Sequence, residues 1–233
     1  MQTEARLIKD SDSRQRVIDA AVACILDQGF YRASSNAIAD RAGVTWGVIQ
    51  YYFGSREALM LAVLQEGARR LTDTLANADI TGGTVTERVG QYGDILASYY
   101  AAPEYLAFAQ VMLNLIYDPR TTRQSRETMD RIAETATPEL HRLQQQVLAG
   151  ADVRGRVMRD MLLHALRGLA LSHAMVTTVP EQPADPQPFG EQRRLLAEAI
   201  GLLIEQEGGS GKQNCGTGKT AGKGGATGDP ASF

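Results

Sequence analysis

Apolar residues recur along this chain with the spacing of buried helix faces, and the first such face predicts a helix over residues 12–27. Asp12 is its expected N-cap, with Gln15 at the spacing of a capping box. Gly29 follows the last periodic position and ends the helix. Residues 1–11 lack this periodicity, and we expect them to form a flexible N-terminus. The buried face, at positions i, i+3, i+4 and i+7, comprises Ile18, Ala21, Val22 and Ile25.

Two short helices and then a long one are predicted next. Ser34 is expected to cap a helix through Arg41, and Thr45 a helix through Tyr52 or Phe53, because a hydroxyl at the N-cap accepts a free backbone N–H. Gly43 lies between them, where a left-handed turn costs glycine little. Gly54 and Ser55 then introduce a helix over 56–78, whose apolar side carries Leu59, Val63, Leu64 and Leu71.

The rest of the chain, after a loop at residues 81–84, is also predicted to be helical. Prolines and a Gly-Ala-Asp step separate the helices, and Pro138 kinks or divides one of them. No stretch shows the alternation of a strand, so the fold class is all-α. From residue 208 the composition becomes glycine-rich, which predicts a disordered tail over 208–233. The expected helices are 84–101, 104–117, 120–149, 153–179 and 190–207.

Composition and charge narrow the class of protein only a little. Hydrophobic residues make up 43% of the chain and charged residues 22%, as in ordinary globular proteins, and the net charge is −3. A nucleic-acid partner would therefore have to meet a local basic surface, and residues 1–56 carry a net charge of only +1. Two isolated cysteines, Cys24 and Cys215, form neither a disulfide framework nor a metal cluster.

The expected location is the cytoplasm. The polar N-terminus lacks the apolar core of an export signal. The most apolar long stretch, 161–179, contains His164, Arg167 and His173, which argues against a membrane span. Two isolated cysteines also fit a reducing compartment.

The segment 34–53, SSNAIADRAGVTWGVIQYYF, has the build of a helix-turn-helix. Two short helices are joined by a glycine-containing turn, and the second has only a thin apolar inner face. Its outer side can enter a major groove, with its first turn nearest to the base edges. The free N–H groups at the helix start also favour phosphate.

The ordered motifs around this segment resemble the tetracycline-repressor (TetR) family of regulators. They are Gly29-Phe30, Ile38-Ala39, Ala42-Gly43-Val44-Thr45, Gly47, Tyr51-Tyr52-Phe53 and Gly54-Ser55-Arg56-Glu57-Ala58-Leu59, and they span about residues 13–66. The resemblance implies a three-helix DNA-binding domain over 12–55 and a larger ligand-binding and dimerisation domain over 56–207, with 56–78 as the connecting helix. It also implies a homodimer formed through the helices at 153–179 and 190–207.

Two positions depart from the family pattern. Ala33 stands where the family often has Thr, so capping depends on Ser34 or Ser35. Gln50 stands where an aromatic residue, usually Tyr, is common. Glutamine can pair with adenine through two hydrogen bonds. We therefore predict that Gln50 helps to read an A·T base pair.

Residue chemistry and the resemblance together assign the DNA-contacting side chains. Polar residues at the two helix starts and the glycine that permits close approach are expected to face DNA, and Tyr51, Tyr52 and Arg56 are expected on phosphates. Each of them has an ordinary surface or packing alternative. The core side is assigned to Ile38, Ala42, Val44, Val48, Ile49 and Phe53. The full predicted DNA-binding set is Ser34, Ser35, Asn36, Thr45, Trp46, Gly47, Gln50, Tyr51, Tyr52 and Arg56.

A small-molecule pocket is expected among the helices of 84–179, because such sites are mostly apolar with a few polar groups. Core packing is the competing explanation for every candidate. His164 and His173 are nine residues apart and so point to opposite sides of one helix, which excludes a metal ion shared by these two side chains within one subunit. No metal or other cofactor is expected. The candidate lining residues are Tyr99, Tyr105, Phe108, Met112, Met161 and His164.

The sequence thus predicts a ligand-responsive transcriptional regulator, most simply a repressor that a small, largely apolar effector releases from double-stranded operator DNA. Two alternatives remain open at this stage. One is an all-helical enzyme or small-molecule-binding protein with a non-functional helix-turn-helix, although no catalytic motif is found in the chain. The other is a helical interaction module that has lost DNA binding, against which the intact turn at Gly43 argues.

Overall fold

Ten α-helices and no strand make up the part of the chain that the computed structural model describes, residues 2–147, 153–177 and 187–210. The all-α prediction is confirmed, and most helices lie where the apolar periodicity placed them. In chain order they are α1 (Gln2–Gln28), α2 (Ser35–Ala42), α3 (Trp46–Phe53), α4 (Arg56–Ala76), α5 (Val85–Tyr100), α6 (Pro103–Tyr117), α7 (Arg123–Glu134), α8 (Thr137–Val147), α9 (Val153–Thr177) and α10 (Gln187–Ser210).

The N-terminal helix differs most from its predicted extent. It begins at Gln2, so the segment 1–11 that we expected to be a flexible N-terminus is helical from residue 2. Asp12 lies inside α1 and cannot act as its N-cap. The physical reason is that residues 2–11 contain no glycine or proline, so nothing interrupts a helix that the apolar face further along stabilises.

Prolines shape two other boundaries. The helix expected over 120–149 is divided into α7 and α8 just before Pro138, as one of the two predicted outcomes. Pro188, expected in a connecting segment, instead lies in the first turn of α10, where a missing N–H costs nothing. The segment 208–233, predicted as a disordered tail, is helical through Ser210, and its residues 211–233 lie outside the described part.

Two hydrophobic cores organise these helices, and they do not divide at residue 55. The first core combines α1, α2 and the inner face of α3 with α4 and with α6 residues such as Phe108 and Val111. The second combines the end of α4 with α5, α8, α9 and α10. The helix α4 passes through both and contacts α1, α3, α5, α6, α7 and α8. Any displacement of α4 would therefore be felt in both cores.

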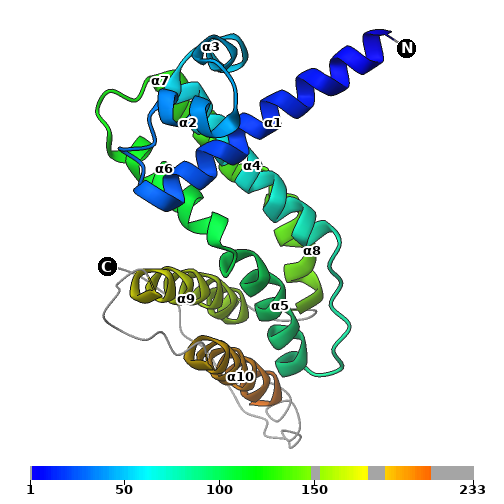
Figure 1. Cartoon of the computed structure of the whole chain (residues 1–233). Helices are drawn as coiled ribbons and strands as arrows, with labels where there is room; N and C mark the ends of the chain where they lie inside the picture. The colour runs from blue at the N-terminus through cyan, green and yellow to red at the C-terminus, as the bar shows by residue number, and fades with distance from the viewer. Residues whose placement is uncertain (1, 148–152, 178–186, 211–233) are drawn as a thin grey trace, which may run out of the picture.

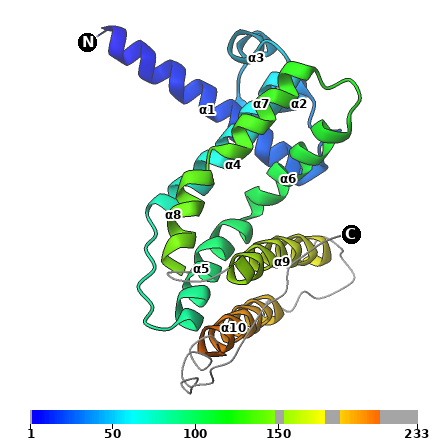
Figure 2. The same cartoon turned by 180° about the vertical axis from the view of Figure 1, so that it is seen from behind.

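The two cores place α3 and the α9–α10 pair at opposite ends of the molecule. Figure 1 shows α2 and α3 beside the first turn of α4, while α9 and α10 lie side by side at the far end; the reverse view in Figure 2 agrees. The helix α10 packs closely on α5, where a Cβ at Gly201 would come within 2.6 Å of the Thr86 Cα. Within the described residues, no helix is long and apolar enough to cross a membrane.

Candidate DNA-binding surface

The turn between α2 and α3 is built as the sequence predicted. The Ser34 hydroxyl accepts the Ala37 N–H at 3.2 Å and so caps α2. Gly43 ends α2 in the left-handed region, with φ of 65°, which a residue with a side chain adopts at a cost. The Val44 N–H then donates to the Ala39 carbonyl at 3.0 Å, so that the turn is closed by backbone hydrogen bonds. The angle between the two helices is thereby fixed.

The start of α3 differs from its prediction in one detail. Thr45 occupies the N-cap position with extended backbone, but its side chain makes no capping hydrogen bond. Only its backbone participates, since the Thr45 carbonyl accepts the Val48 N–H at 3.0 Å. The Thr45 hydroxyl is therefore not engaged in capping, and the first turn of α3 keeps free backbone N–H groups.

One face of α3 is buried and the other is open to solvent. Ile49 is 3% exposed and belongs to the first core, together with the half-buried Val44 and Phe53. Trp46 is 54% and Tyr51 75% exposed. A large exposed aromatic pair on a short helix is unusual for a surface that contacts only water. The outward face of α3, which we call the reading face, comprises Trp46, Gly47, Gln50 and Tyr51, all exposed.

The other predicted DNA-contacting residues are less uniform. Ser34, Asn36 and Thr45 are exposed, whereas Ser35 is half-buried. Tyr52 is also half-buried, and its ring lies edge-on to that of Tyr51 at 5.1 Å between centroids. Its packing alternative therefore has support, while an outward-directed hydroxyl at Tyr52 stays a prediction.

Arg56 occupies a different environment from the phosphate clamp that we expected. Its guanidinium donates to the Phe30 carbonyl at 2.6 Å and to the Ala33 carbonyl at 3.4 Å. It also stacks on the Phe30 ring, 4.4 Å from the centroid. Burial lowers the pKa of this arginine. The side chain thus fastens the first turn of α4 to the loop before α2, and this explains its position without any phosphate.

Two exposed residues beside this surface were missed by the sequence reasoning. Tyr31, 83% exposed, and the exposed Arg32 stand in the loop between α1 and α2. This loop is held by Arg56 and by Gln110 of α6, whose side-chain oxygen accepts the Phe30 N–H at 3.3 Å. The sequence feature that could have indicated them is that an aromatic and a basic residue directly follow the Gly29-Phe30 motif.

A second tie joins α4 to α7. The Glu57 carboxylate accepts the Thr122 hydroxyl at 3.1 Å and the Thr122 N–H at 3.3 Å, at the start of α7. Hydrogen bonds from Ser125 and Thr122 lower the pKa of Glu57. The first turn of α4 is therefore bound to the loop before α2 through Arg56 and to α7 through Glu57.

The candidate ligand residues separate into two groups. Tyr99, Tyr105 and Phe108 line one cavity of about 280 Å³ between α4, α5 and α6, which we call the tyrosine cavity. Met112, Met161 and His164 are exposed and do not line it, so the pocket expected from all six is wrong in that half. The reason is helical phase: α6 buries Phe108 and Val111, and α9 buries Leu162 and Leu166, which turns these three side chains outward.

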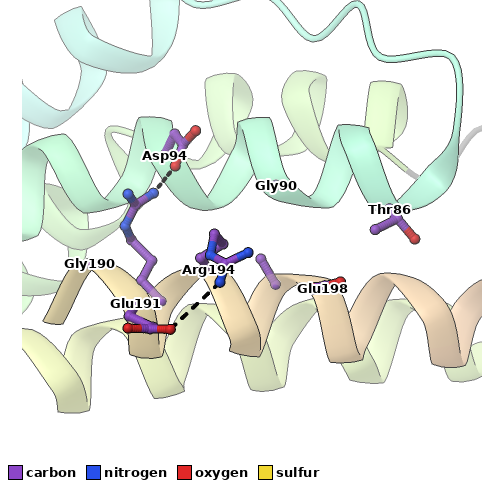
Figure 3. Close-up of a pocket in the computed structure, with 9 residues that line it drawn as sticks. Thr86, Gly90, Asp94, Gly190, Glu191, Arg194 and Glu198 are labelled. Atoms are coloured by element: carbon purple, nitrogen blue, oxygen red, sulfur yellow. Dashed lines mark ion pairs between the residues drawn. The ribbon is translucent and has the colours of Figure 1, made fainter. Parts of the chain in front are cut away.

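A cavity of about 820 Å³ lies elsewhere, between α5 and α10, and is lined largely by charged residues (Figure 3). An ion pair joins Asp94 to Arg193, and Arg194 lies 3.7 Å from Glu191. These four charged side chains are paired with one another, and none of the six candidate ligand residues lines this cavity. Among the described residues, no group of three or more His, Cys, Asp or Glu side chains is arranged to hold a metal ion.

Comparison with known proteins places this surface in a family. Residues 17–63 match the family described as "Bacterial regulatory proteins, tetR family". The chain is similar to the HTH-type transcriptional regulator BetI of Escherichia coli strain SMS-3-5, with 26% identity over 144 residues, which cover 59% of this chain and 72% of the relative. It is also similar to the HTH-type transcriptional repressor AcnR of Corynebacterium efficiens, with 31% identity over 68 residues, covering 29% and 36% of the two chains.

Solved structures share the fold over most of the length. A transcriptional regulator from Rhodococcus sp. Rha1 superimposes with a TM-score of 0.62 at 18% identity, covering 83% of this chain and 96% of the other. The multidrug binding protein EbrR, solved with imidazole, gives a TM-score of 0.51 at 19% identity, covering 82% and 94%. At these identities the likeness concerns the fold, which extends beyond the matched N-terminal segment to the helices that follow it.

Proposed function

This chain is a TetR-family regulator by its N-terminal DNA-binding domain, and from that premise we propose that it binds an operator as a dimer and releases it in response to a small molecule. DNA-binding transcriptional regulation is what the family does, and enzymes are not part of it. The dimer, the operator contacts and the response to a ligand are the proposed steps.

The reading face of α3 is the observation that carries the proposal. It is held rigidly from behind by Ile49 and by the turn at Gly43, and it presents an aromatic ring, an amide and a phenol to solvent. In the proposed complex, Gln50 and Trp46 lie against base edges, and Gly47 allows the backbone to approach. Tyr51 donates to a phosphate oxygen, and Ser34 and Asn36 contact the backbone beside it. Base contacts select the sequence, and phosphate contacts fix the register.

The proposed dimer forms through the far end of the molecule. In the single chain, α9 exposes Val157 and Met161, which are 53% and 60% accessible, and α10 exposes Leu195, Leu202 and Leu203. Apolar side chains of this size on two adjacent helices are typical of a helix-bundle interface. A second copy would cover them, and two reading faces would double the base contacts that one short helix can make.

The proposed response to ligand runs through α4 and α6. Tyr105 and Phe108 of α6 line the tyrosine cavity, and Gln110, less than one turn further along the same helix, holds the loop before α2. Arg56 and Glu57 tie α4 to that loop and to α7. A ligand that shifts α6 or α4 would change the separation of the two reading faces and lose the match to half-sites spaced by the DNA repeat. We propose repression because the relative AcnR is named a transcriptional repressor.

A mobility-shift titration of the full-length protein tests the proposal. The probe is the DNA that flanks its own gene, and an equally long fragment from within the coding sequence is the control. We expect saturable binding to the flanking fragment at a concentration at least a hundredfold lower than to the control. Equal binding to both fragments would contradict operator recognition.

A further inference from the structure

A cation that has no ion-pair partner among the described residues packs on Tyr100 of the second core, near the tyrosine cavity. The Arg167 side chain of α9 is half-buried, and its Nε donates to the Tyr100 hydroxyl at 2.7 Å. The guanidinium carbon also stands 5.4 Å from the centre of the Tyr100 ring. Within the described part of the chain, no carboxylate forms an ion pair with Arg167. A half-buried charge without a counter-ion is costly, so an anion bound beside it would be stabilised.

The cluster around Arg167 consists of hydrogen-bond donors. The rings of Tyr99, Tyr100 and Tyr105 pack edge-on, with centroids 4.8 to 5.7 Å apart. Tyr99 is satisfied, since its hydroxyl donates to the Gly67 carbonyl at 3.1 Å. Tyr100 accepts from Arg167 and keeps its own proton to donate. Among the described residues, neither the Tyr100 nor the Tyr105 hydroxyl finds an acceptor.

The two phenols remain donors at neutral pH. Burial raises the pKa of both Tyr100 and Tyr105 above the ordinary value for tyrosine. A protonated phenol donates one hydrogen bond, and a guanidinium donates several and accepts none. The missing partner is therefore an acceptor with negative charge, because an amine or ammonium group would add a further donor beside Arg167.

The neighbouring cavity indicates what carries this charge. Tyr105 and Tyr99 line the tyrosine cavity together with Phe108, and Tyr105 also packs on Tyr100, so one aromatic layer joins the cavity to the arginine. The volume of about 280 Å³ suits a body of roughly one aromatic ring with a short chain. The arginine that lines the cavity itself, Arg70, is already committed, with Glu66 at 2.8 Å and Glu104 at 3.6 Å.

We infer that Arg167, Tyr100 and Tyr105 form the head-group site for a carboxylate ligand, whose apolar body occupies the tyrosine cavity. This rests on the proposed function, because it names the chemical class of the effector. The carboxylate oxygens accept from the Arg167 guanidinium and the two phenols, and Tyr99 and Phe108 contact the body. Binding at this point would order α5, α6 and α9 against one another, and α6 reaches the loop before α2 through Gln110.

Three probes of one shape but different charge test the inference by calorimetry on the full-length protein. They are 3-phenylpropionate, its primary amide and 3-phenylpropylamine. We expect the wild-type protein to bind the carboxylate at least about tenfold more tightly than the amide, as a charge-assisted hydrogen bond implies, and to bind the amine most weakly. Binding that favours the amide or the amine, or no binding of any probe at millimolar concentration, would overturn the inference.

Matched variants locate the charge. Arg167→Gln should abolish the preference for the carboxylate and leave the amide affinity unchanged, while Arg167→Lys should keep part of it. If Arg167→Gln does not fold, Arg167→Met should show the same loss of carboxylate preference, because methionine retains the apolar part of the arginine side chain. Arg70→Gln is the control at the same cavity, and a loss of preference there instead would assign the anion to Arg70 and contradict the inference.

The hydroxyl donors have a similar matched pair. Tyr105→Phe should weaken carboxylate binding several-fold, whereas Tyr99→Phe should not, because the Tyr99 hydroxyl already donates to the Gly67 carbonyl.

A mobility shift on the flanking DNA, run on the same protein preparations without any carboxylate probe, distinguishes failure of the head-group site from failure of the proposed function. Normal operator binding with no carboxylate preference would overturn only the head-group site, whereas loss of operator recognition by the wild type would contradict the regulator itself.

Discussion

At the scale of single residues, exposure distinguishes recognition from support. Gln50 is exposed on the same side of α3 as Trp46, one helical turn earlier, while Ile49 beside it is buried. Arg56, which sequence reasoning placed on phosphate, is instead hydrogen-bonded to two backbone carbonyls. In the proposed complex Gln50 reads a base and Arg56 supports the loop before α2, and different measurements test these two roles.

Replacing Gln50 by Ala should weaken binding selectively. If the amide pairs with adenine, the variant loses about 1–3 kcal/mol on operators that retain the contacted A·T pair and little on operators in which that pair is changed. Fluorescence anisotropy with both operators for both proteins gives the coupling between side chain and base pair. An equal loss on every sequence would contradict base reading by Gln50.

Replacing Arg56 by Ala should destabilise the fold by about 1–3 kcal/mol, because the Phe30 and Ala33 carbonyls lose their partner. Urea unfolding measures this loss, and Arg32→Ala, at an exposed neighbour, should stay within about 0.5 kcal/mol of the wild type. The salt dependence of DNA binding discriminates further. A supporting role leaves the slope unchanged, whereas a phosphate clamp would reduce it by about one.

At the scale of elements, the first turn of α4 joins the loop before α2, and through it the DNA-binding helices α2 and α3, to the rest of the molecule. Ser55 caps this helix by accepting the Ala58 N–H at 3.1 Å. Arg56 and Glu57 then point to different neighbours, the loop before α2 and the start of α7. A negative carboxylate at the N-terminus of α7 is also favoured by the helix dipole.

The tie between Glu57 and α7 should depend on pH. Hydrogen bonds from Ser125 and Thr122 lower the pKa of Glu57 in the folded state below the ordinary value of 4.5. Its contribution to stability is therefore complete above about pH 4.5 and is lost as the pH falls through the lowered value. Urea melts should show Glu57→Gln less stable than the wild type at pH 7, with the difference shrinking below pH 4.5.

A substitution of Thr122, which donates to Glu57, supplies the control. Thr122→Val removes the hydroxyl donor, and it should reduce the stability difference between the Glu57→Gln variant and its Glu57 parent at pH 7. A difference that stays constant from pH 7 to pH 3.5 would show that Glu57 acts through packing and not through its charge.

Sequence patterns predicted the elements better than the contacts between them. Local signals, such as Ser34 at an N-cap and Gly43 at a left-handed turn, depend on a few neighbouring residues and were confirmed. Thr45 had the same signal, yet its side chain makes no capping bond. Met112, Met161 and His164 were assigned to a pocket by residue type, but the phase of α6 and α9 against their neighbours turns them outward. That phase depends on tertiary packing, which periodicity within one helix does not contain.

At the scale of the whole molecule, α3 and the exposed apolar face of α9 and α10 stand at opposite ends, with α4 through both cores. The arrangement suits a dimer held at one end that spaces two reading faces at the other. The all-α fold class was predictable from the sequence, whereas the assignment of dimerisation to α9 and α10 and of DNA reading to α3 stays a prediction. The packing of α4 and α6 against α1, α2 and α3 in the first core was not predictable, because it depends on contacts between residues far apart in the chain.

A charged side chain introduced into the exposed apolar face of α9 and α10 should prevent dimer formation. Leu202→Glu would place a carboxylate in the proposed α9–α10 interface and should shift the protein to monomer in analytical ultracentrifugation, with at least a tenfold loss of operator affinity. Leu113→Glu on α6 is a matched control, because Leu113 is 48% and Leu202 47% exposed in the single chain. A dimer that survives Leu202→Glu, or is lost with Leu113→Glu, would contradict the proposed interface.

Photo-crosslinking from the reading face tests the central claim most directly. A benzoylphenylalanine is introduced at Tyr51 of α3 in one protein and at Tyr117 of α6 in another, since these tyrosines are 75% and 79% exposed. After irradiation with the flanking DNA, we expect covalent adducts from position 51, mapped to two half-sites one or more helical turns apart, and none from position 117. Adducts from position 117 alone, or equal adducts from both positions, would contradict DNA reading by α3.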